Sequence, residues 1–176
     1  PATPTTLGSV FGYTTSNGNT AIGCCAGNVT VSGADNIAIG RCSLLATTTG
    51  YGNIAIGVCA LSTVTTGHQN IAIGKCALMC NKGINNVALG TGVMQCGING
   101  GANVGIGLRA LLCNEGFYNV AIGFSTLGNN STGGLNVAIG LSSMYGNISG
   151  CDNTAIGHWS LCKNTVGIGN TAVGIC

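Results

Sequence analysis

The sequence predicts an all-β protein built as a single parallel β-solenoid of about ten rungs. The main evidence for this fold is the pentapeptide Asn-x-Ala-Ile-Gly, which recurs ten times with small variations, every 16 or 17 residues along the 176-residue chain. A fixed period this short indicates one small structural unit stacked on itself. Each unit also holds a β-branched run ended by Gly, which is typical of a short strand, and 32 glycines oppose helix. The repeat asparagines are Asn19, Asn36, Asn53, Asn70, Asn86, Asn103, Asn119, Asn136, Asn153 and Asn170.

The repeat divides the chain into two parts. Residues 1–18 resemble a degenerate unit and are predicted to form an N-terminal cap or docking segment, and residues 19–176 form the ten rungs. Rungs about 4.8 Å apart give a rod of roughly 48 Å. No polar cap is evident at either end, and the last unit stops midway at Cys176. Open strand edges of this kind predict end-to-end stacking of rods.

The columns of the repeat predict which side chains share a face. With the Asn as position 0, position +4 is always Gly, +2 is usually Ala, and +1 and +3 are mostly Ile or Val. Alternation places +1 and +3 on one face and +2 and +4 on the other. We expect the bulky face to fill the lumen together with the Leu or Met of position +8. The flat Ala/Gly face then points outward, where it either merely suits a tight coil or packs against another copy, most simply as a trimer.

The remainder of each unit is predicted to contain a shorter second strand around +6 to +8 and a Thr/Gly-rich turn. Stacked Asn side chains are expected to hydrogen-bond to one another or to the backbone at the corner. Position +5 is the most variable and indicates either an adhesive stripe or an unconstrained surface. Its residues are Cys24, Arg41, Val58, Lys75, Thr91, Leu108, Phe124, Leu141, His158 and Ile175.

Composition limits the possible partners. Only 5% of the residues are charged, and the mean hydropathy is +0.48, which predicts a surface covered by neighbouring copies of the same chain. A net charge of +2 provides no basic footprint for nucleic acid. No stretch approaches the roughly 18 apolar residues of a membrane helix, so no membrane insertion is expected. The sequence leaves any surface ligand open.

Eleven cysteines favour disulfides and an oxidising, extracellular setting. Two columns, at +6 and +10, place cysteines on successive rungs at a spacing that a disulfide can bridge. The alternative is stacked free thiols that act as small hydrophobes. Because eleven is odd, at least one thiol is free or pairs between chains. If rods stack head to tail, Cys176 lies one rung from the next subunit, so it is a candidate for a bond to Cys24 or Cys25 there. The candidates for bonds within the chain are Cys25, Cys42, Cys59, Cys76, Cys80, Cys96 and Cys113.

Four Asn-x-Ser/Thr sequons also fit a secreted protein, because each falls between the pentapeptides, where a loop is expected. The candidate glycosylation sites are Asn28, Asn129, Asn130 and Asn147.

The polar residues do not form a recognisable reaction centre. Asp152, His158 and Cys162 share one unit, but this grouping occurs once, on a rod with no evident pocket. The cysteine and histidine spacings do not match a closed zinc site, and three acidic residues are too few for a calcium ladder. The sequence therefore predicts no enzyme, no catalytic residue, no cofactor and no metal site.

Units such as Asn-Ile-Ala-Ile-Gly-Lys-Cys-Ala-Leu at 70–78 resemble the repeats of phage and large-virus tail fibres and of bacterial surface proteins. They also resemble the head repeats of trimeric autotransporter adhesins. This resemblance covers residues 19–176, and it implies a left-handed parallel β-roll that assembles as a trimer. The cysteine columns, the 16–17-residue period and the lack of a stalk or membrane anchor depart from the autotransporter pattern.

We therefore expect a structural subunit of an extracellular fibre, on a cell or virion surface, that stacks end to end into a disulfide-reinforced filament. The first alternative is a trimeric adhesin or receptor-binding fibre head. A lesser alternative is an ice-binding solenoid, which needs a flat Thr ladder. Thr47–Thr49, Thr63, Thr65 and Thr66 supply only a fragment of one.

Overall fold

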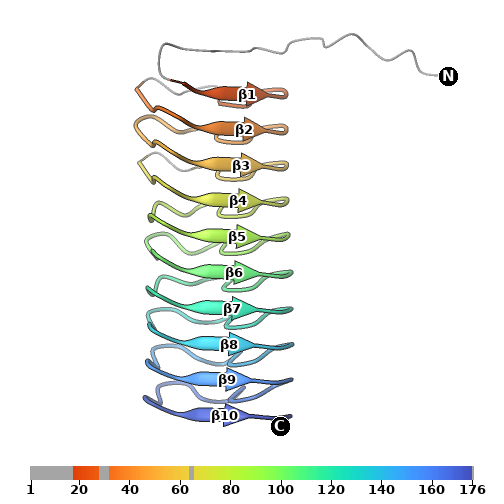
Figure 1. Ribbon diagram of the computed structural model, residues 1–176, viewed down its shortest axis with the longest axis vertical. Helices are drawn as coiled ribbons and strands as arrows, with labels where there is room; N and C mark the ends of the chain where they lie inside the picture. The colour runs from red at the N-terminus through yellow and green to blue at the C-terminus, as the bar shows by residue number, and fades with distance from the viewer. Residues whose placement is uncertain (1–17, 28–31, 64–65, 176) are drawn as a thin grey trace, which may run out of the picture.

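The protein is a straight rod of stacked coils, in a computed structural model that describes residues 18–27, 32–63 and 66–175 (Figure 1). All ten strands of the described residues lie in one parallel sheet, which confirms the predicted all-β solenoid. Nearly all of the predicted N-terminal segment at 1–18 lies outside the described residues. The strands are β1 Thr20–Ile22, β2 Ile37–Ile39, β3 Ile54–Ile56, β4 Ile71–Ile73, β5 Val87–Leu89, β6 Val104–Ile106, β7 Val120–Ile122, β8 Val137–Ile139, β9 Thr154–Ile156 and β10 Thr171–Val173.

Every strand pairs with the next one along the chain, so equivalent residues of successive rungs stack directly. A rung is the coil that begins at one repeat Asn and ends before the next. Ala55 pairs with Ala72 across β3 and β4, and Ala72 pairs with Ala88 across β4 and β5. The second of these steps is one residue shorter, yet the register is the same. The missing residue is therefore absorbed in the turn and not in the strand.

The predicted orientation of the strand faces was wrong. The alternation is correct, but the Ala of position +2 points into the lumen and the Ile or Val of +1 and +3 points outward. Ala55 and Ala72 are completely buried, whereas Ile22 and Ile73 are 43% and 40% exposed. The Leu or Met of +8 fills the lumen as predicted, with Leu61 fully buried. A coil with three-residue strands has room for one large side chain per rung, and position +8 occupies that room.

Gly105 shows how little space the lumen leaves. It is the one residue at +2 that is not Ala, and a Cβ atom there would lie 2.6 Å from Cγ1 of Val93 and 3.0 Å from Cε of Met94. Val93 occupies position +7, where most rungs carry Ala or Ser. The larger side chain on one wall is thus compensated by a smaller residue on the other, as close packing requires.

The predicted second strand at +6 to +8 was also wrong, because this segment is a corner. Positions +6 and +8 adopt left-handed conformations, with φ of 58° at Cys59 and 50° at Leu61. Its backbone still bonds between rungs, since the Leu61 N–H donates to the Ala77 carbonyl at 3.0 Å. The chain therefore turns sharply without leaving its backbone groups unpaired.

The Gly of position +4 is required by the neighbouring rung and not by a second copy. At Gly107, φ is +118° and a Cβ atom would lie 2.6 Å from the carbonyl oxygen of Gly123. Only Gly combines this backbone conformation with so close an approach. The expected Ala/Gly outer face is accordingly absent from the described part of the rod.

The repeat asparagines form a continuous buried ladder. Asn103 donates its backbone N–H and its Nδ2 to Oδ1 of Asn86, at 3.0 and 3.1 Å, and Nδ2 also donates to the Gly116 carbonyl at 2.9 Å. Its own Oδ1 accepts the same pair of bonds from Asn119. Each amide thus links its own rung to both neighbours and to the turn that closes the coil.

A second column of buried asparagines at position +11 was not predicted. Asn147 donates Nδ2 to Oδ1 of Asn130 at 2.7 Å and to the Gly150 carbonyl at 3.0 Å. The signal was present in the sequence, since Asn recurs at +11 in five units. They are Asn81, Asn114, Asn130 and Asn147, which are buried, and Asn164, which is half-buried.

We predict that Asn103→Ala destabilises the rod by about 3 kcal/mol or more, because it leaves several buried hydrogen-bonding groups of neighbouring rungs without partners. Chemical denaturation followed by circular dichroism measures the change. Asn129→Ala is the matched control, since Asn129 is exposed. Equal effects of the two substitutions would contradict the ladder's role.

A second prediction concerns Gly105 and Val93. Gly105→Ala alone should cost about 1–3 kcal/mol through overpacking. Combining it with Val93→Ala removes the closest clash, so the double variant should be more stable than the sum of the single effects allows. A double-mutant cycle of unfolding free energies measures this coupling, and strict additivity would argue against a shared lumen contact.

Candidate functional site: the outer surface of the rod

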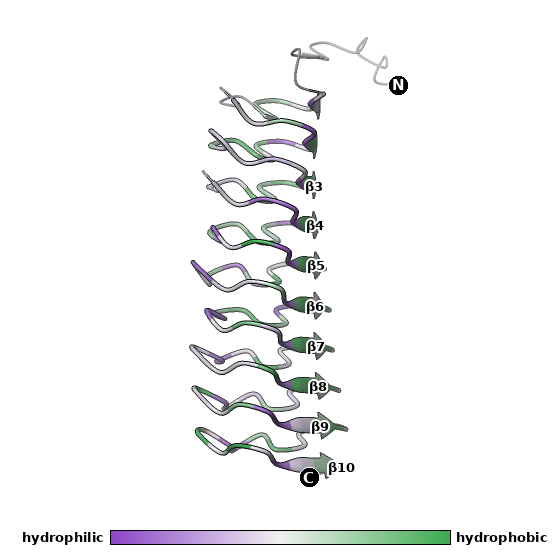
Figure 2. Ribbon diagram, turned by 60° about the vertical axis from the view of Figure 1, so that its left-hand side comes forward, coloured by the Kyte–Doolittle hydropathy of each residue, from purple (hydrophilic) through white to green (hydrophobic). Residues whose placement is uncertain are grey.

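The most prominent surface is the outward face of the sheet, which we call the outer Ile/Val face. It comprises the +1 and +3 side chains of β1 to β10, and Figure 2 shows these strands as a hydrophobic band along one edge of the rod. Its members are partly exposed, at 36% for both Ile122 and Ile139. The two columns contain no charged residue. The structure thus leaves an uncharged apolar strip along the length of the sheet.

The variable +5 column enlarges this strip only towards the C-terminal half of the rod. Leu108, Phe124 and Leu141 are 44%, 47% and 44% exposed. In the N-terminal half the same column carries Arg41 and Lys75, which are also exposed. Within the +5 column, the cationic Arg41 and Lys75 thus lie in the N-terminal half, and the large apolar side chains lie towards the C-terminal half.

The cysteines lie on the outer surface, at corners and turns. All ten cysteines among the described residues are free thiols, and none is completely buried. Stacking holds for both predicted columns, because the rungs are in register. The predicted disulfides are not formed in the structure, so pairing stays a prediction. The described cysteines are Cys24, Cys25, Cys42, Cys59, Cys76, Cys80, Cys96, Cys113, Cys151 and Cys162.

Neighbouring thiols influence one another. Sγ of Cys24 and Sγ of Cys25 are 3.5 Å apart. The pKa of Cys25 is raised above its ordinary value, first by the hydrogen bond with Cys24 and also by Cys42 on the next rung. Burial, followed by the proximity of Cys96, raises the pKa of Cys113. Raised pKa values disfavour the thiolate, which is the opposite of what an activated nucleophile needs.

Of the predicted inter-subunit cysteines, Cys24 and Cys25 lie exposed on the first rung, while Cys176 lies outside the described residues.

The sequons fall in different environments. Asn28 lies outside the described residues, and Asn129 is exposed. Asn130 and Asn147 are completely buried members of the second Asn column, and their Nδ2 atoms already donate two hydrogen bonds each. Both residues lie between the strands, as expected, but their side chains are buried. Because Nδ2 is the atom to which a sugar would attach, neither is available as a glycosylation site in the folded rod.

The remaining polar side chains do not converge. Asp152 and His158 are both exposed, and His158 packs edge-on against Trp159, with ring centroids 5.5 Å apart. Tyr51 and His68 stack on successive rungs with ring centroids 4.6 Å apart. The described residues contain no group of three or more His, Cys, Asp or Glu suited to a metal ion. Within the same residues there is no helix that is long and apolar enough to cross a membrane.

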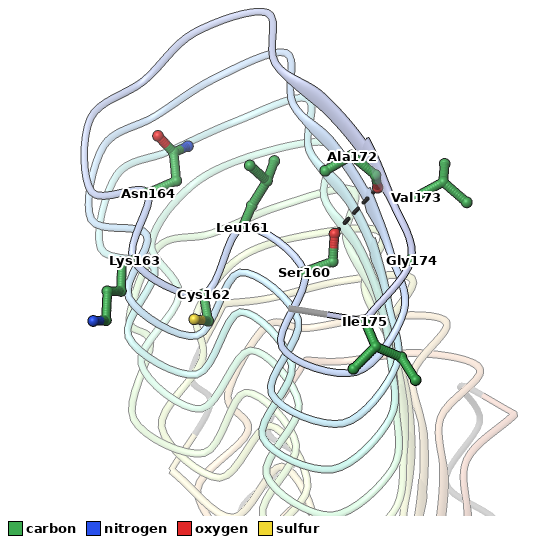
Figure 3. A pocket seen from close by; sticks show the side chains of 9 residues that line it. All are labelled: Ser160, Leu161, Cys162, Lys163, Asn164, Ala172, Val173, Gly174 and Ile175. Carbon is green, nitrogen blue, oxygen red and sulfur yellow. Dashed lines mark hydrogen bonds between the residues drawn. The ribbon is translucent and has the colours of Figure 1, made fainter.

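The hollow at the last rung is the mouth of the lumen (Figure 3). Leu161 points into it, Ser160 donates to the Ala172 carbonyl at 3.2 Å across its wall, and Val173 points away from it. This view shows directly that the +3 side chain faces outward while the +8 side chain fills the coil.

Comparisons with known protein families, curated proteins and solved structures find no match to this chain.

We predict that the folded protein, when secreted from a glycosylating host, carries no glycan on Asn130 or Asn147, because a sugar on either Nδ2 would break the buried column. Glycopeptide mass spectrometry tests this, with Asn129 as the exposed internal comparison. A glycan on Asn147 of correctly folded protein would contradict the arrangement of that column.

Proposed function

We propose that this chain is a structural rod of an extracellular fibre, where it supplies stiffness and a repetitive surface for assembly. The observation that supports this most strongly is the unbroken register of ten equivalent three-residue strands. Such a sheet resists bending because every rung is hydrogen-bonded to its neighbours by both backbone and side-chain amides. A buried ladder of this kind uses many residues whose only role is to hold one rung against the next.

The outer Ile/Val face favours side-by-side assembly as the way in which the rods associate. We propose that its occupant is a second copy of the same chain. A partner must present an equally long uncharged surface with the same rung spacing, and this chain presents one. Ile139 and its column neighbours would then be buried between rods, which removes apolar surface from water. A trimer with the three sheets facing inward is the simplest closed arrangement.

End-to-end stacking into a filament is the other mode that we propose, and disulfides would reinforce it. The two modes differ in what they bury, because stacking covers rung ends and side-by-side assembly covers the sheet face. A substitution on the face therefore separates them.

The ice-binding alternative has less support. The exposed sheet face carries Ile and Val in place of a Thr ladder, with Thr20, Thr154 and Thr171 as its only threonines. In the predicted Thr fragment, Thr47 is completely buried.

To test side-by-side assembly, we would replace Ile122 and Ile139 by Lys in one variant. Both side chains point outward, so the fold should be retained, while two buried ammonium groups per chain would oppose contact. Sedimentation velocity should show the wild-type protein as a species several times heavier than the 17.3 kDa chain, and the variant as a single chain. Thr132→Lys with Ser149→Lys is the control, because it adds the same charge at exposed turn positions.

Three results would change the proposal. A wild-type protein that sediments as a single chain at every concentration would refute assembly. A lysine variant that associates like the wild type would exclude the outer Ile/Val face. Filaments with an axial repeat near 50 Å that persist in this variant would instead support end-to-end stacking, because ten rungs at about 4.8 Å give that length.

A further inference from the structure

The two cysteine columns together cover successive rungs without a gap. The +6 column runs from the rung of β1 to that of β4, and the +10 column runs from the rung of β4 to that of β6. Each of the five steps between these six rungs therefore has a cysteine directly above another. The rungs of β7 to β10 have no cysteine in either column among the described residues. The +6 column is Cys25, Cys42, Cys59 and Cys76, and the +10 column is Cys80, Cys96 and Cys113.

Backbone geometry brings column neighbours within reach of a disulfide. The Cys42 N–H donates to the Cys24 carbonyl at 2.9 Å, and the Cys59 N–H donates to the Arg41 carbonyl at 3.0 Å. Column neighbours are therefore separated by the strand spacing of about 4.8 Å, inside the Cα window for disulfides. Their Cβ atoms must approach by about 0.3–1 Å to reach the Cβ separation of a disulfide. The column lies in the corner, where side chains are only partly buried and free to tilt.

We propose that these columns are sites of rung-to-rung disulfides, formed by exchange with a low-molecular-weight disulfide such as oxidised glutathione. We infer the pairing Cys25–Cys42, Cys59–Cys76 and Cys96–Cys113, with Cys80 left as a free thiol. This inference does not depend on how rods associate, because every bond lies within one chain.

The pairing follows from the number of thiols in each column. Four stacked cysteines form two bonds only if the outer pairs join, since a Cys42–Cys59 bond would leave both end cysteines alone. Three stacked cysteines form one bond. In that column the backbone hydrogen bond from the Cys96 N–H to the Leu112 carbonyl is 2.9 Å, whereas the bond from the Cys80 N–H to the Gln95 carbonyl is 3.2 Å. The rungs are therefore closer at Cys96 and Cys113, which leaves Cys80 unpaired. The three bonds consume six of the eleven thiols.

The chemistry is a two-step exchange. A column thiolate attacks one sulfur of oxidised glutathione, forms a mixed disulfide and releases one glutathione thiolate. The thiolate of the neighbouring rung then attacks the protein sulfur of that mixed disulfide and releases the second glutathione thiolate. Both released thiolates take up the protons lost by the two cysteines. Two protein thiols are thus oxidised and one glutathione disulfide is reduced.

Each bond should stabilise the rod because it closes a loop of one repeat in the unfolded chain. The first bond is expected to raise the melting temperature by roughly 6–12 °C. The raised pKa of Cys25 means that the exchange should accelerate as the pH rises, because more of the thiol becomes thiolate.

The main competitor is a bond between Cys24 and Cys25, whose sulfurs already lie 3.5 Å apart. A bond between these sequence neighbours joins no rungs. It should therefore leave the melting temperature almost unchanged, which distinguishes it from the proposed rung-to-rung disulfides.

The test is to incubate the full chain with oxidised glutathione, block the remaining thiols by alkylation and digest with pepsin at acid pH, where exchange is suppressed. Mass spectrometry without reduction should find the three proposed cross-links and alkylated Cys80. In Cys59→Ser, Cys76 should stay alkylated while Cys25–Cys42 still forms. Cys151→Ser is the control and should leave the map unchanged, because Cys151 belongs to neither column.

Two outcomes would overturn the proposal. One is glutathione attached singly to column cysteines, with no cross-link between rungs. The other is Cys24–Cys25 as the main product, with Cys42 alkylated. Circular dichroism of each variant verifies that the rod is folded before the maps are compared.

Discussion

The structure depends on the exact repetition of one hydrogen-bonded step between rungs. At each step an asparagine amide accepts two bonds from the next rung, while its own Nδ2 reaches the turn that closes the coil, as at Asn103. Because the amide is buried, its loss would leave neighbouring groups unpaired, so the interaction holds the rungs in register. Register in turn sets the position of every other column: the Ala and Leu of the lumen, the Gly at the corner, the outward Ile and the cysteines.

Much of this could be predicted from the sequence, since a period of 16–17 residues determines the solenoid and its stacked columns. The orientation of the sheet could not be derived from alternation, which states which residues share a face and not which face is inside. Lumen width decides this, and the signal was the small side chain at position +2. Gly105 beside Val93 shows the same constraint, because a smaller residue on one wall of the lumen compensates for a larger side chain on the other.

Other features were missed because they involve backbone conformations that composition does not reveal. Position +8 reads as part of a strand, yet Leu111 has a φ of 53° and sits at a corner. The second Asn column was hidden by units with other residues at +11, such as Thr47 and Gly97. The outward cysteine and Ile/Val columns follow from register once the corner is known. The roles that we propose for these columns in cross-linking and assembly rest on the exposure of their side chains.

The sheet turns its Ile and Val side chains outward, and the central claim is our proposal that copies of the rod associate through this face. Cryo-electron microscopy of the assembled wild-type protein, at a resolution that shows side chains, tests it most directly. We predict density for rods side by side, with Ile73 and Ile122 buried between their sheets and the Ala column inside each coil. Rods that touch only at their ends, or sheets whose Ile columns face solvent throughout the assembly, would contradict this account.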